Sequence, residues 1–397
     1  MSVANTIQEL ECMGEARTLV DRKRRSLRRI INFATQLEGG GAQMVAAQLR
    51  DGFLQLGFEA SLLAFLYEKR SFELPGPKPI ILAQRKPRLF QLPGLCAKIL
   101  KLLWGEKPDV VISHSVYTNL LVLPIAAILG IPHRVTVQHN ETQDVSFLVQ
   151  KLYALFHLIG ISTHTVFVSD AAHRTYLDKF KCFKNGSSVV KNVISLAWDS
   201  ADSEGLESAN LQTGERLLFC VGRLSRQKNH AVLIEAMKEV RGCKLVIAGE
   251  GELRLVLEEQ IKAAGLQESI LLLGEIPRER IVALFGVCDV FVMPSLYEGR
   301  SLAMLEAAEA GCVIVASKIP SFEELLHSCP NEVSFFDVDS PADLANKINS
   351  IVASLPQWRG LDERIRSMRS RAEDSERSVN LELSKAYCEK NGWLSKG

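Results

Sequence analysis

The chain has 397 residues, of which 47% are hydrophobic and 23% charged, and its formal net charge is +1. This composition is that of a globular protein, and the length predicts about two domains. The longest apolar run, which starts at Leu120, has about a dozen residues and is shorter than the roughly 20 that span a bilayer, so we expect a soluble protein.

Charge is distributed unevenly along the chain. Residues 1–200 carry 24 Lys and Arg against 16 Asp and Glu, a net charge of +8, whereas residues 201–397 carry 23 against 30, a net charge of −7. Either the first half meets an anionic partner or the difference is solvated charge without a function. Nine cysteines without a C-x-x-C spacing indicate reduced thiols and a cytoplasmic location.

Residues 1–27 are predicted to form an extension that precedes the first domain. Short apolar runs then alternate with helical patterns, which predicts parallel sheets flanked by helices. The strands expected in a domain over residues 28–200 are Arg29–Thr35, Glu59–Phe65, Asp109–Ser115, His133–His139 and His164–Asp170. A polar linker over Ala197–Arg216 follows, and a second domain over residues 201–375 has expected strands at Arg216–Gly222, Cys243–Gly249, Ser269–Glu275, Asp289–Ser295 and Cys312–Ser317. The fold class is α/β with two Rossmann-like domains, and the default ligand site is the crevice at the carboxyl ends of both sheets.

A cluster of glycines, Gly39 to Gly41, follows the first strand and precedes a helix. It allows backbone N–H groups at the helix end to approach an anion, although a tight turn alone gives the same pattern. Because the spacing is not G-x-G-x-x-G, a dinucleotide fingerprint is not supported.

Two basic residues, Arg223 and Lys228, follow the strand that ends near Gly222. Five residues apart in one loop, they suit a single diphosphate, with Arg binding in a bidentate way and Lys as a point charge. The alternative is a solvated basic loop. Another strand ends at Gly249, where a flat ligand can lie close to the backbone, or where the chain simply turns.

Two glutamates, Glu298 and Glu306, stand eight residues apart around the predicted start of a helix near Ser301. A buried carboxylate is costly unless it is paired, which favours a binding role over a place in a core helix. Two such groups can hold hydroxyls on different rings of one elongated ligand, while helix-end N–H groups face its phosphates.

His139 and His114 each end a predicted strand. A lone histidine in this position is more often structural than catalytic. The eight histidines show no H-E-x-x-H or comparable spacing, and we expect neither a metal ion nor a cofactor.

Taken in this order, the motifs resemble the large family of retaining nucleotide-sugar glycosyltransferases with two facing Rossmann-like domains, the GT-B architecture (glycosyl transferases group 1). The stretches that carry the resemblance are GGGAQMVAAQL, VSD, KNVISLAWD, VGRLSRQKN, VIAGEGELR, IPSFEEL and the run from LLLGEIPRER to AGCVIVAS. The resemblance is strongest from about Phe219 to Leu326. It implies that a C-terminal helix over residues 376–397 packs back on the first domain.

The resemblance also implies roles for the candidate residues. Arg223 and Lys228 would clamp the diphosphate, and Glu306 would hold the ribose hydroxyls. Glu298 would contact the donor sugar, together with the backbone from Gly299 to Leu302. The other donor-binding positions would be Gly40, Gly41, Gly222 and Gly249, and His139 would lie near C6 of the donor sugar or the reacting centre.

The chain departs from the family pattern at Arg300 and Ser301, where members usually have Phe-Gly after Glu-Gly. The extra cation at Arg300 would grip a charged sugar or a phosphate, or face solvent. The stretch NVISLAWD also replaces the usual Asn-Gly-Val/Ile-Asp, which leaves the hinge geometry open.

Residues 84–105 interleave basic and apolar side chains, a pattern typical of a helix on an anionic membrane and equally of an ordinary helix packed on a sheet. The resemblance then implies a hexosyltransferase that works without a metal ion and retains the anomeric configuration. It would move a hexose or N-acetylhexosamine from a nucleoside-diphosphate sugar, most simply a UDP-sugar, to a glycan or lipid-linked saccharide of lipopolysaccharide or capsule synthesis. We expect it in the cytoplasm or on the inner face of the cytoplasmic membrane, and we expect no nucleic-acid partner. The alternatives are a nucleotide-sugar epimerase of similar architecture and a degenerate partner subunit.

Overall fold

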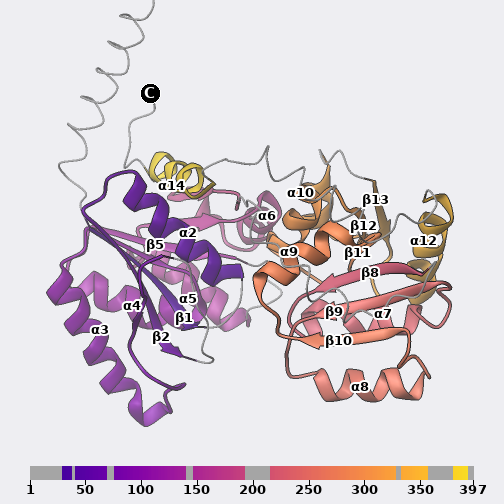
Figure 1. Cartoon of the computed structure of the whole chain (residues 1–397). Helices are drawn as coiled ribbons and strands as arrows, with labels where there is room; N and C mark the ends of the chain where they lie inside the picture. Colours follow the sequence, from indigo (N-terminus) through magenta and orange to yellow (C-terminus); the bar gives the residue numbers. More distant parts are fainter. Residues whose placement is uncertain are drawn as a thin grey trace, which may run out of the picture. The chain divides into compact units, whose positions relative to one another are not determined.

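The computed structural model describes seven stretches of the chain: residues 29–37, 41–68, 76–139, 146–192, 215–327, 332–355 and 379–391. The predicted extension, most of the predicted linker and Gly40 lie outside these residues. The chain divides into two compact units, which we call unit 1 (Met1–Val193 with Ser378–Gly397) and unit 2 (Ile194–Arg377). Figure 1 shows both.

The strands described in unit 1 form a parallel seven-stranded sheet in the order β3-β2-β1-β4-β5-β6-β7. Their bounds in that order are Ile80–Ile81, Ala60–Glu68, Arg29–Leu37, Val110–Ser113, His133–Gln138, His164–Phe167 and Ser187–Val189. The chain order reverses between β1 and β4, which places the carboxyl ends of these two strands at a topological switch point.

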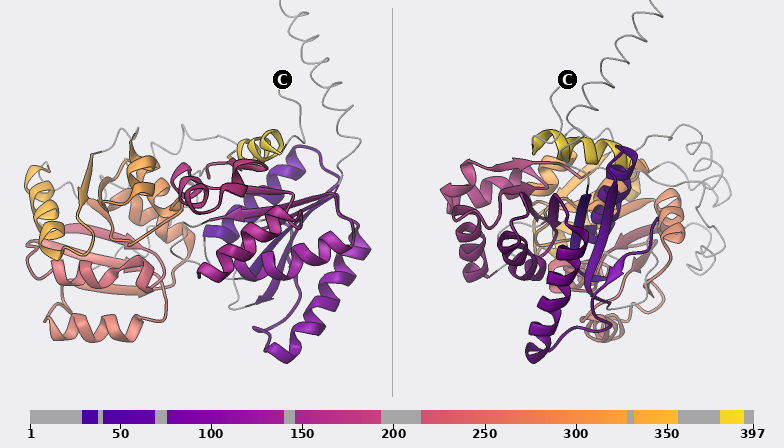
Figure 2. Two further views of the ribbon diagram at one scale, coloured as in Figure 1. Left: turned by 180° about the vertical axis from the view of Figure 1, so that it is seen from behind. Right: turned by 90° about the vertical axis from the view of Figure 1, so that its left-hand side faces the viewer.

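Helices cover both faces of this sheet (Figure 2). Helix α2 (Gly41–Gln55) packs on one face, and α3 (Leu92–Glu106) and α4 (Val116–Ile128) pack on the other. Helix α5 (Phe147–Leu158) shares a cluster with α4, with α6 (Asp170–Lys179) and with the short helix η3 (Lys181–Lys184). Helix α3 is preceded by a single turn, η1 (Leu89–Gln91).

The C-terminal helix α14 (Val379–Lys390) packs against α2 within unit 1. The hydroxyl of Ser384 donates a hydrogen bond of 3.3 Å to the carbonyl of Leu49, and Tyr387 and Cys388 are fully buried. The end of the chain thus completes the core of the unit in which the chain begins.

The strands described in unit 2 form a parallel six-stranded sheet in the order β10-β9-β8-β11-β12-β13. Their bounds in that order are Ile270–Gly274, Cys243–Ala248, Arg216–Val221, Val290–Met293, Val313–Ser317 and Val333–Phe336. The helices around this sheet are α7 (His230–Ala236), α8 (Arg254–Ala263), α9 (Arg278–Val287), α10 (Leu302–Glu309), α11 (Pro320–Leu326) and α12 (Pro341–Ser354). Here the switch point lies between β8 and β11.

An aspartate locks the amino ends of the central strand pair in each unit. Asp109 accepts a hydrogen bond of 3.0 Å from the backbone N–H of Arg29. Asp289 accepts one of 2.7 Å from Leu217 and one of 3.0 Å from the guanidinium of Arg216. These bonds fix β4 beside β1 and β11 beside β8, and so fix the loops at the opposite, carboxyl ends.

Each of the ten predicted strands is present, with ends that differ by at most three residues from the prediction. The two α/β domains with parallel sheets and flanking helices are confirmed. None of the helices in the described part of the chain combines the length and the hydropathy that a membrane-spanning helix requires.

Candidate functional site

Unit 2 places two predicted residues in contact at its switch point. Lys228 ends the short helix η6 (Arg226–Lys228) in the loop after β8, and Glu298 lies in the loop after β11. The ammonium Nζ of Lys228 is 2.5 Å from Oε1 of Glu298. The same carboxylate oxygen accepts a hydrogen bond of 2.9 Å from the hydroxyl of Ser295.

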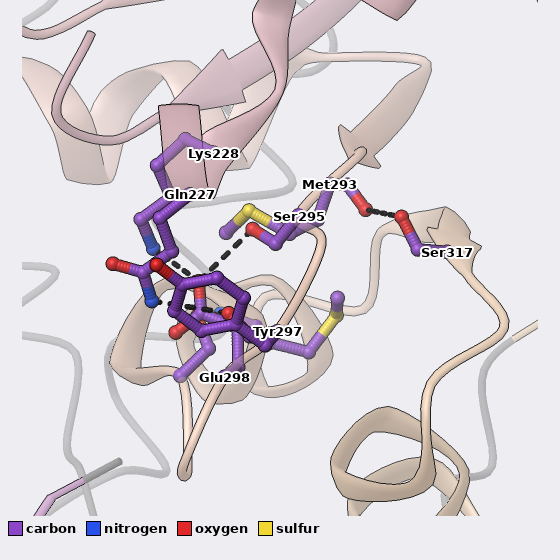
Figure 3. Close-up of polar contacts among 9 residues, drawn as sticks. Gln227, Lys228, Met293, Ser295, Tyr297, Glu298 and Ser317 are labelled. Carbon is purple, nitrogen blue, oxygen red and sulfur yellow. Dashed lines mark hydrogen bonds and ion pairs between the residues drawn. The ribbon is translucent and has the colours of Figure 1, made fainter. Parts of the chain in front are cut away.

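The two loops are joined by further hydrogen bonds around this pair (Figure 3). The side-chain amide of Gln227 donates to the carbonyl of Tyr297 over 3.0 Å, and the backbone N–H of Leu296 donates to the carbonyl of Gln227 over 2.9 Å. The pair is largely shielded, with side-chain exposures of 17% for Lys228 and 7% for Glu298. The geometry therefore holds one cation and one anion at the carboxyl ends of the parallel strands.

The second glutamate is also buried and also paired. Glu306 lies in α10, and its Oε1 is 2.7 Å from Nη2 of Arg278, the first residue of α9. Burial raises the pKa of Glu306, and the positive charge of Arg278 opposes that rise. Arg278 therefore favours the ionised form of Glu306, in which both carboxylate oxygens can accept hydrogen bonds from hydroxyls. The sequence analysis missed Arg278, since nothing in its local pattern identifies its partner.

The residues between the glutamates form the start of α10. The hydroxyl of Ser301 caps this helix by accepting a hydrogen bond of 3.4 Å from the backbone N–H of Met304. Gly299 is buried, and Arg300 and Leu302 are partly exposed. The first N–H groups of a helix have no partner within it, so this end offers donors to an anion.

Near the ends of β8 and β9, two backbone segments lie so close together that only glycine fits at two positions. A Cβ added to Gly249 would lie 2.0 Å from the carbonyl oxygen of Gly222, and one added to Gly251 would lie 2.3 Å from that of Leu224. Gly249 also has a φ of 139°, which side chains disfavour. The packing of these two loops is enough to require glycine there.

Two other predicted contacts to phosphate lie at helix or strand ends. Arg223 follows β8, and its side chain is exposed. Gly41 is the first residue of α2 and is exposed, at the carboxyl end of β1.

Unit 1 brings His139 and His114 together at the carboxyl ends of β5 and β4. The distance from Nδ1 of His114 to Nε2 of His139 is 3.1 Å, and Nε2 of His114 is 3.3 Å from Oδ1 of Asn32. His114 is 2% exposed and Asn32 is fully buried. Burial lowers the pKa of His139 to about 4, and burial with the neighbouring His139 lowers the pKa of His114 well below its usual value. Both rings are therefore neutral at physiological pH.

This array fixes the tautomers of both rings. Since the oxygen of Asn32 can only accept, Nε2 of His114 carries the proton and its Nδ1 is an acceptor. Nε2 of His139 must then donate to that Nδ1. The remaining nitrogen of His139, Nδ1, is then an acceptor, which suits a hydroxyl group.

The expectation that the sequence holds no Asp-x-Asp pair is wrong, because Asp337 and Asp339 form one. Both are exposed in the loop after β13, where Oδ1 of Asp339 accepts a hydrogen bond of 3.1 Å from the side chain of Asn229. Among the residues that the structure describes, no three His, Cys, Asp or Glu side chains are grouped so as to hold a metal ion.

The basic and apolar stretch 84–105 has a buried side and an exposed side. Leu95, Ile99 and Leu103 are buried in the core against the sheet. Four other large side chains are exposed: Leu89 (86%), Phe90 (73%), Leu100 (44%) and Trp104 (67%). Beside them, a groove of about 420 Å³ is lined by Arg85, Lys86 and Lys98 among others. The packing interpretation is confirmed for the buried side of α3, and membrane contact through the exposed side stays a prediction.

Two family models match the chain one after the other. The model described as Glycosyltransferase Family 4 matches residues 39–198, and the model described as Glycosyl transferases group 1 matches residues 203–368.

The relatives include transferases whose names specify a lipid-linked saccharide as the acceptor. The chain is 28% identical over 304 residues, which are 72% of it and 79% of the relative, to the Campylobacter jejuni N-acetylgalactosamine-N,N'-diacetylbacillosaminyl-diphospho-undecaprenol 4-alpha-N-acetylgalactosaminyltransferase. It is 30% identical over 266 residues, 58% of the chain and 66% of the relative, to the Escherichia coli UDP-Gal:alpha-D-GlcNAc-diphosphoundecaprenol alpha-1,3-galactosyltransferase.

Solved structures share the fold. Anabaena HepE in complex with UDP and glucose has a TM-score of 0.71 at 16% identity, over 92% of this chain and 100% of that chain. WaaG, described as a glycosyltransferase involved in lipopolysaccharide biosynthesis, has a TM-score of 0.64 at 14% identity, over 93% of this chain and 100% of that chain. Since the two family models together span most of the sequence and the fold agrees with them, this protein belongs to the group 1 glycosyltransferases of GT-B architecture.

Proposed function

We propose that the protein transfers a hexose or an N-acetylhexosamine from a UDP-sugar to a lipid-linked saccharide, with retention and without a metal ion. The setting is the synthesis of a bacterial surface polysaccharide such as lipopolysaccharide or capsule, at the inner face of the cytoplasmic membrane. The observation that carries the proposal is the pairing of Lys228 with Glu298 at the switch point of unit 2, with Glu306 in the following helix.

The identity of the ligands is supported by the names of similar proteins. The C. jejuni and E. coli relatives both take a diphospho-undecaprenol acceptor by name, and the name of the E. coli relative specifies UDP-Gal. Anabaena HepE was crystallised with UDP and with UDP-glucose. The relatives move different sugars, which leaves the donor sugar as the point that the experiment must decide.

The pair of Lys228 and Glu298 suits an exchange of partners when the donor binds. The ammonium group has three donors, and one of them is directed at Glu298. A diphosphate competes for Lys228, and the carboxylate of Glu298 is then released to accept hydroxyls of the donor sugar. Arg223, exposed after the same strand, adds a second cation to the diphosphate.

In the reaction, the bond between the anomeric carbon and the diphosphate oxygen breaks while positive charge develops on the sugar. Lys228, Arg223 and the N–H groups at the start of α10 stabilise the negative charge of the departing nucleoside diphosphate. The acceptor hydroxyl oxygen bonds to the anomeric carbon from the face that the diphosphate leaves, and its proton passes to a departing phosphate oxygen. Glu306, kept ionised by Arg278, holds the ribose hydroxyls, and Nδ1 of His139 accepts a hydroxyl of the donor sugar.

The acceptor is assigned to unit 1, at the surface formed by η1 and α3. A lipid-linked saccharide has an anionic diphosphate next to an apolar chain, and this surface has cations next to exposed Phe90 and Trp104. The fixed positive charges of Lys86 and Lys98 line the groove that would receive the diphosphate.

The proposal is tested by incubating the protein with UDP-glucose, UDP-galactose, UDP-N-acetylglucosamine, UDP-N-acetylgalactosamine or GDP-mannose. Each donor is supplied with and without a short polyprenyl-diphosphate-linked N-acetylhexosamine, and released nucleoside diphosphate is measured. We expect release that depends on the acceptor and occurs with one UDP-sugar, unchanged by EDTA. The coupling constant between H1 and H2 of the transferred sugar, measured by NMR, then reports whether configuration is retained.

Three outcomes would contradict parts of the proposal. Interconversion of the donor sugars without an acceptor indicates the epimerase instead. Activity that EDTA removes and Mg²⁺ restores contradicts the metal-independent mechanism. Release with GDP-mannose alone contradicts the assignment of UDP.

A further inference from the structure

Two cysteines of unit 2 meet where two neighbouring helices end. Cys288 directly follows α9, and Cys312 lies between the end of α10 and the start of β12. Both are thiols in the structure, and their Sγ atoms are 3.7 Å apart, so the two sulfurs are in contact. A disulfide has an S–S distance of about 2.05 Å, so an approach of about 1.7 Å separates the two thiols from a bond.

One backbone carbonyl gathers the two thiols. The thiol of Cys312 donates to the carbonyl oxygen of Phe285 over 3.2 Å, and the thiol of Cys288 donates to the same oxygen over 3.7 Å. Phe285 belongs to the last turn of α9, so the thiol that precedes β12 is directed at the end of this helix. Strands β11 and β12 are paired from Val290 and Val313 onward, which keeps the two backbones adjacent. The fold thus brings together two thiols that are 24 positions apart in the sequence.

The two thiols differ in their access to solvent. Cys288 is half-buried, whereas Cys312 is buried, with 5% of its surface exposed. Oxidation of a cysteine requires access to the oxidant, and a second thiol nearby converts the first product into a disulfide. Cys288 is therefore the thiol that an oxidant reaches, and Cys312 is the thiol that resolves the product.

We propose that Cys288 and Cys312 form an oxidation site, at which a peroxide converts the two thiols into an intramolecular disulfide. The thiolate of Cys288 attacks one oxygen of hydrogen peroxide, the O–O bond breaks, and hydroxide leaves while Cys288 becomes a sulfenic acid. The sulfur of Cys312 then attacks the sulfur of Cys288, the S–O bond breaks, and water leaves with the proton of the second thiol. In sum, two thiols and one hydrogen peroxide give one disulfide and two molecules of water.

The disulfide closes a loop around both glutamates of the candidate site. The segment from Cys288 to Cys312 contains β11, Glu298 and Glu306. Arg278, the first residue of α9, already holds Glu306, so the disulfide ties α9 to this segment at its other end as well. Because a cross-link restricts the unfolded chain, oxidation makes unit 2 more stable. This effect is independent of the proposed transfer reaction.

Peptide mapping of the oxidised protein tests the site directly. Trypsin cleaves after Arg280, Arg300 and Lys318, which places the two cysteines in separate peptides, 281–300 and 301–318, with one cysteine each. The full-length protein is treated with hydrogen peroxide, remaining thiols are blocked with N-ethylmaleimide, and the unreduced digest is analysed by mass spectrometry. We expect the two peptides joined as one species, two hydrogens lighter than their sum, which dithiothreitol separates.

Thermal unfolding measures the consequence of the bond. The oxidised wild type should have a Tm about 5 °C higher than the reduced wild type, because the disulfide closes a loop of about 25 residues. Cys288→Ser and Cys312→Ala should each abolish this difference. The matched control is Cys182→Ser, which removes a half-buried thiol of unit 1 and should retain both the cross-link and the shift.

Three results would each overturn the proposal. The first is an oxidised wild type in which peptides 281–300 and 301–318 are not joined. The second is a cross-link that leaves the Tm unchanged. The third is Cys288 bonded to another cysteine, or converted to a sulfinic acid while Cys312 remains a thiol. The peptide map and the Tm of the wild type require no variant, so a variant that fails to fold leaves the test intact.

Discussion

The ammonium of Lys228 lies 2.5 Å from the carboxylate of Glu298, across the switch point between β8 and β11. The two residues are 70 positions apart in the sequence, and their loops meet only because β8 and β11 are neighbours in the sheet. Glu298 is 5% exposed, so its charge is tolerated because the cation is there.

Replacement of Lys228 by Ala should reduce kcat/KM about 10²- to 10³-fold, because a preorganised cation that stabilises the leaving diphosphate is lost. The measurement is acceptor-dependent release of nucleoside diphosphate by protein whose fold is verified by circular dichroism. Lys238→Ala is the matched control, since Lys238 forms a surface pair with Glu235 and should leave the rate unchanged. Full activity of Lys228→Ala would rule out the clamp.

Replacement of Arg278 by Met should make activity more sensitive to acid. Burial already raises the pKa of Glu306, and loss of the positive charge of Arg278 removes the effect that opposes this rise. A carboxylate is ionised above its pKa and loses its charge as the pH falls through it. The acid limb of the rate profile should therefore move to higher pH, and the KM for the donor should increase.

The pH dependence of kcat/KM and the Kd for UDP between pH 5 and pH 8 check this prediction. Lys262→Met removes one positive charge from the last turn of α8 and serves as the control. If the acid limbs of Arg278→Met and of the control coincide, Arg278 does not tune Glu306.

Replacement of His114 should act on the reaction through the ring of His139. His114→Leu removes the acceptor that fixes the proton of His139 on Nε2, so both tautomers of His139 become populated. We expect kcat to fall about tenfold with little change in the KM for the donor, since a positioned hydrogen-bond partner acts mainly in the transition state. His114→Gln should recover part of the loss, because its amide oxygen accepts from His139 and its NH₂ donates to Asn32.

Nitrogen-15 NMR of the imidazole rings supplies a readout that a merely structural role would not change. The wild type and His114→Gln should show the Nε2–H tautomer at His139, and His114→Leu should show a mixture. An unchanged tautomer in His114→Leu contradicts the positioning role, whatever the rate.

The central strands of both sheets could be predicted from the sequence because they are buried on both faces and read as apolar runs. The strands that were not predicted are β3, β7 and β13, and each lies at the edge of its sheet. These three strands are short and mostly half-exposed, as in β7 with two serines, so hydropathy does not distinguish them from loops, whereas the edge strand β10 was predicted because its sequence is an apolar run.

For the site, the sequence identified which residues carry charge at strand ends but not how they pair. Lys228 and Glu298 were predicted separately, as a phosphate ligand and a sugar ligand, and their contact is a property of strand order. Arg278 was missed because it stands at the start of a helix that follows a different strand, β10. His114 was considered a strand-end histidine, and its bond to His139 depends on β4 and β5 being adjacent.

His230 should make unit 2 less stable in mild acid. Burial, and to a lesser extent the charge of Lys228, lower its pKa to about 3, and neither ring nitrogen has a hydrogen-bond partner among the described residues. The unfolded chain, with a histidine pKa near 6.5, binds the proton first as the pH falls. The contribution of His230 to the free energy of unfolding therefore has its full value above about pH 6.5 and declines toward pH 3. Between pH 7 and pH 5 it falls by about 2 kcal/mol.

Urea unfolding of the wild type and of His230→Leu at pH 7 and pH 5 measures this contribution. The variant should lose less stability than the wild type between the two pH values, and the difference between the two losses is the quantity of interest. His327→Gln, at an exposed histidine, should behave as the wild type does. Equal losses in the wild type and His230→Leu would mean that His230 accepts a proton in the folded protein.

Replacement of Gly249 by Ala should destabilise the protein in the absence of any ligand. The new Cβ would lie 2.0 Å from the carbonyl oxygen of Gly222, and the φ of 139° is one that alanine rarely adopts. Because two backbone segments must separate, the cost should be at least about 3 kcal/mol. Gly265→Ala is the matched control: its φ of 69° is also positive, but no atom lies within 4 Å of the added Cβ, so it should cost only about 1 kcal/mol. Thermal unfolding of both variants without nucleotide decides the matter. If Gly249→Ala is no less stable than Gly265→Ala but loses affinity for UDP, the glycine serves the ligand and the contact with Gly222 does not require it.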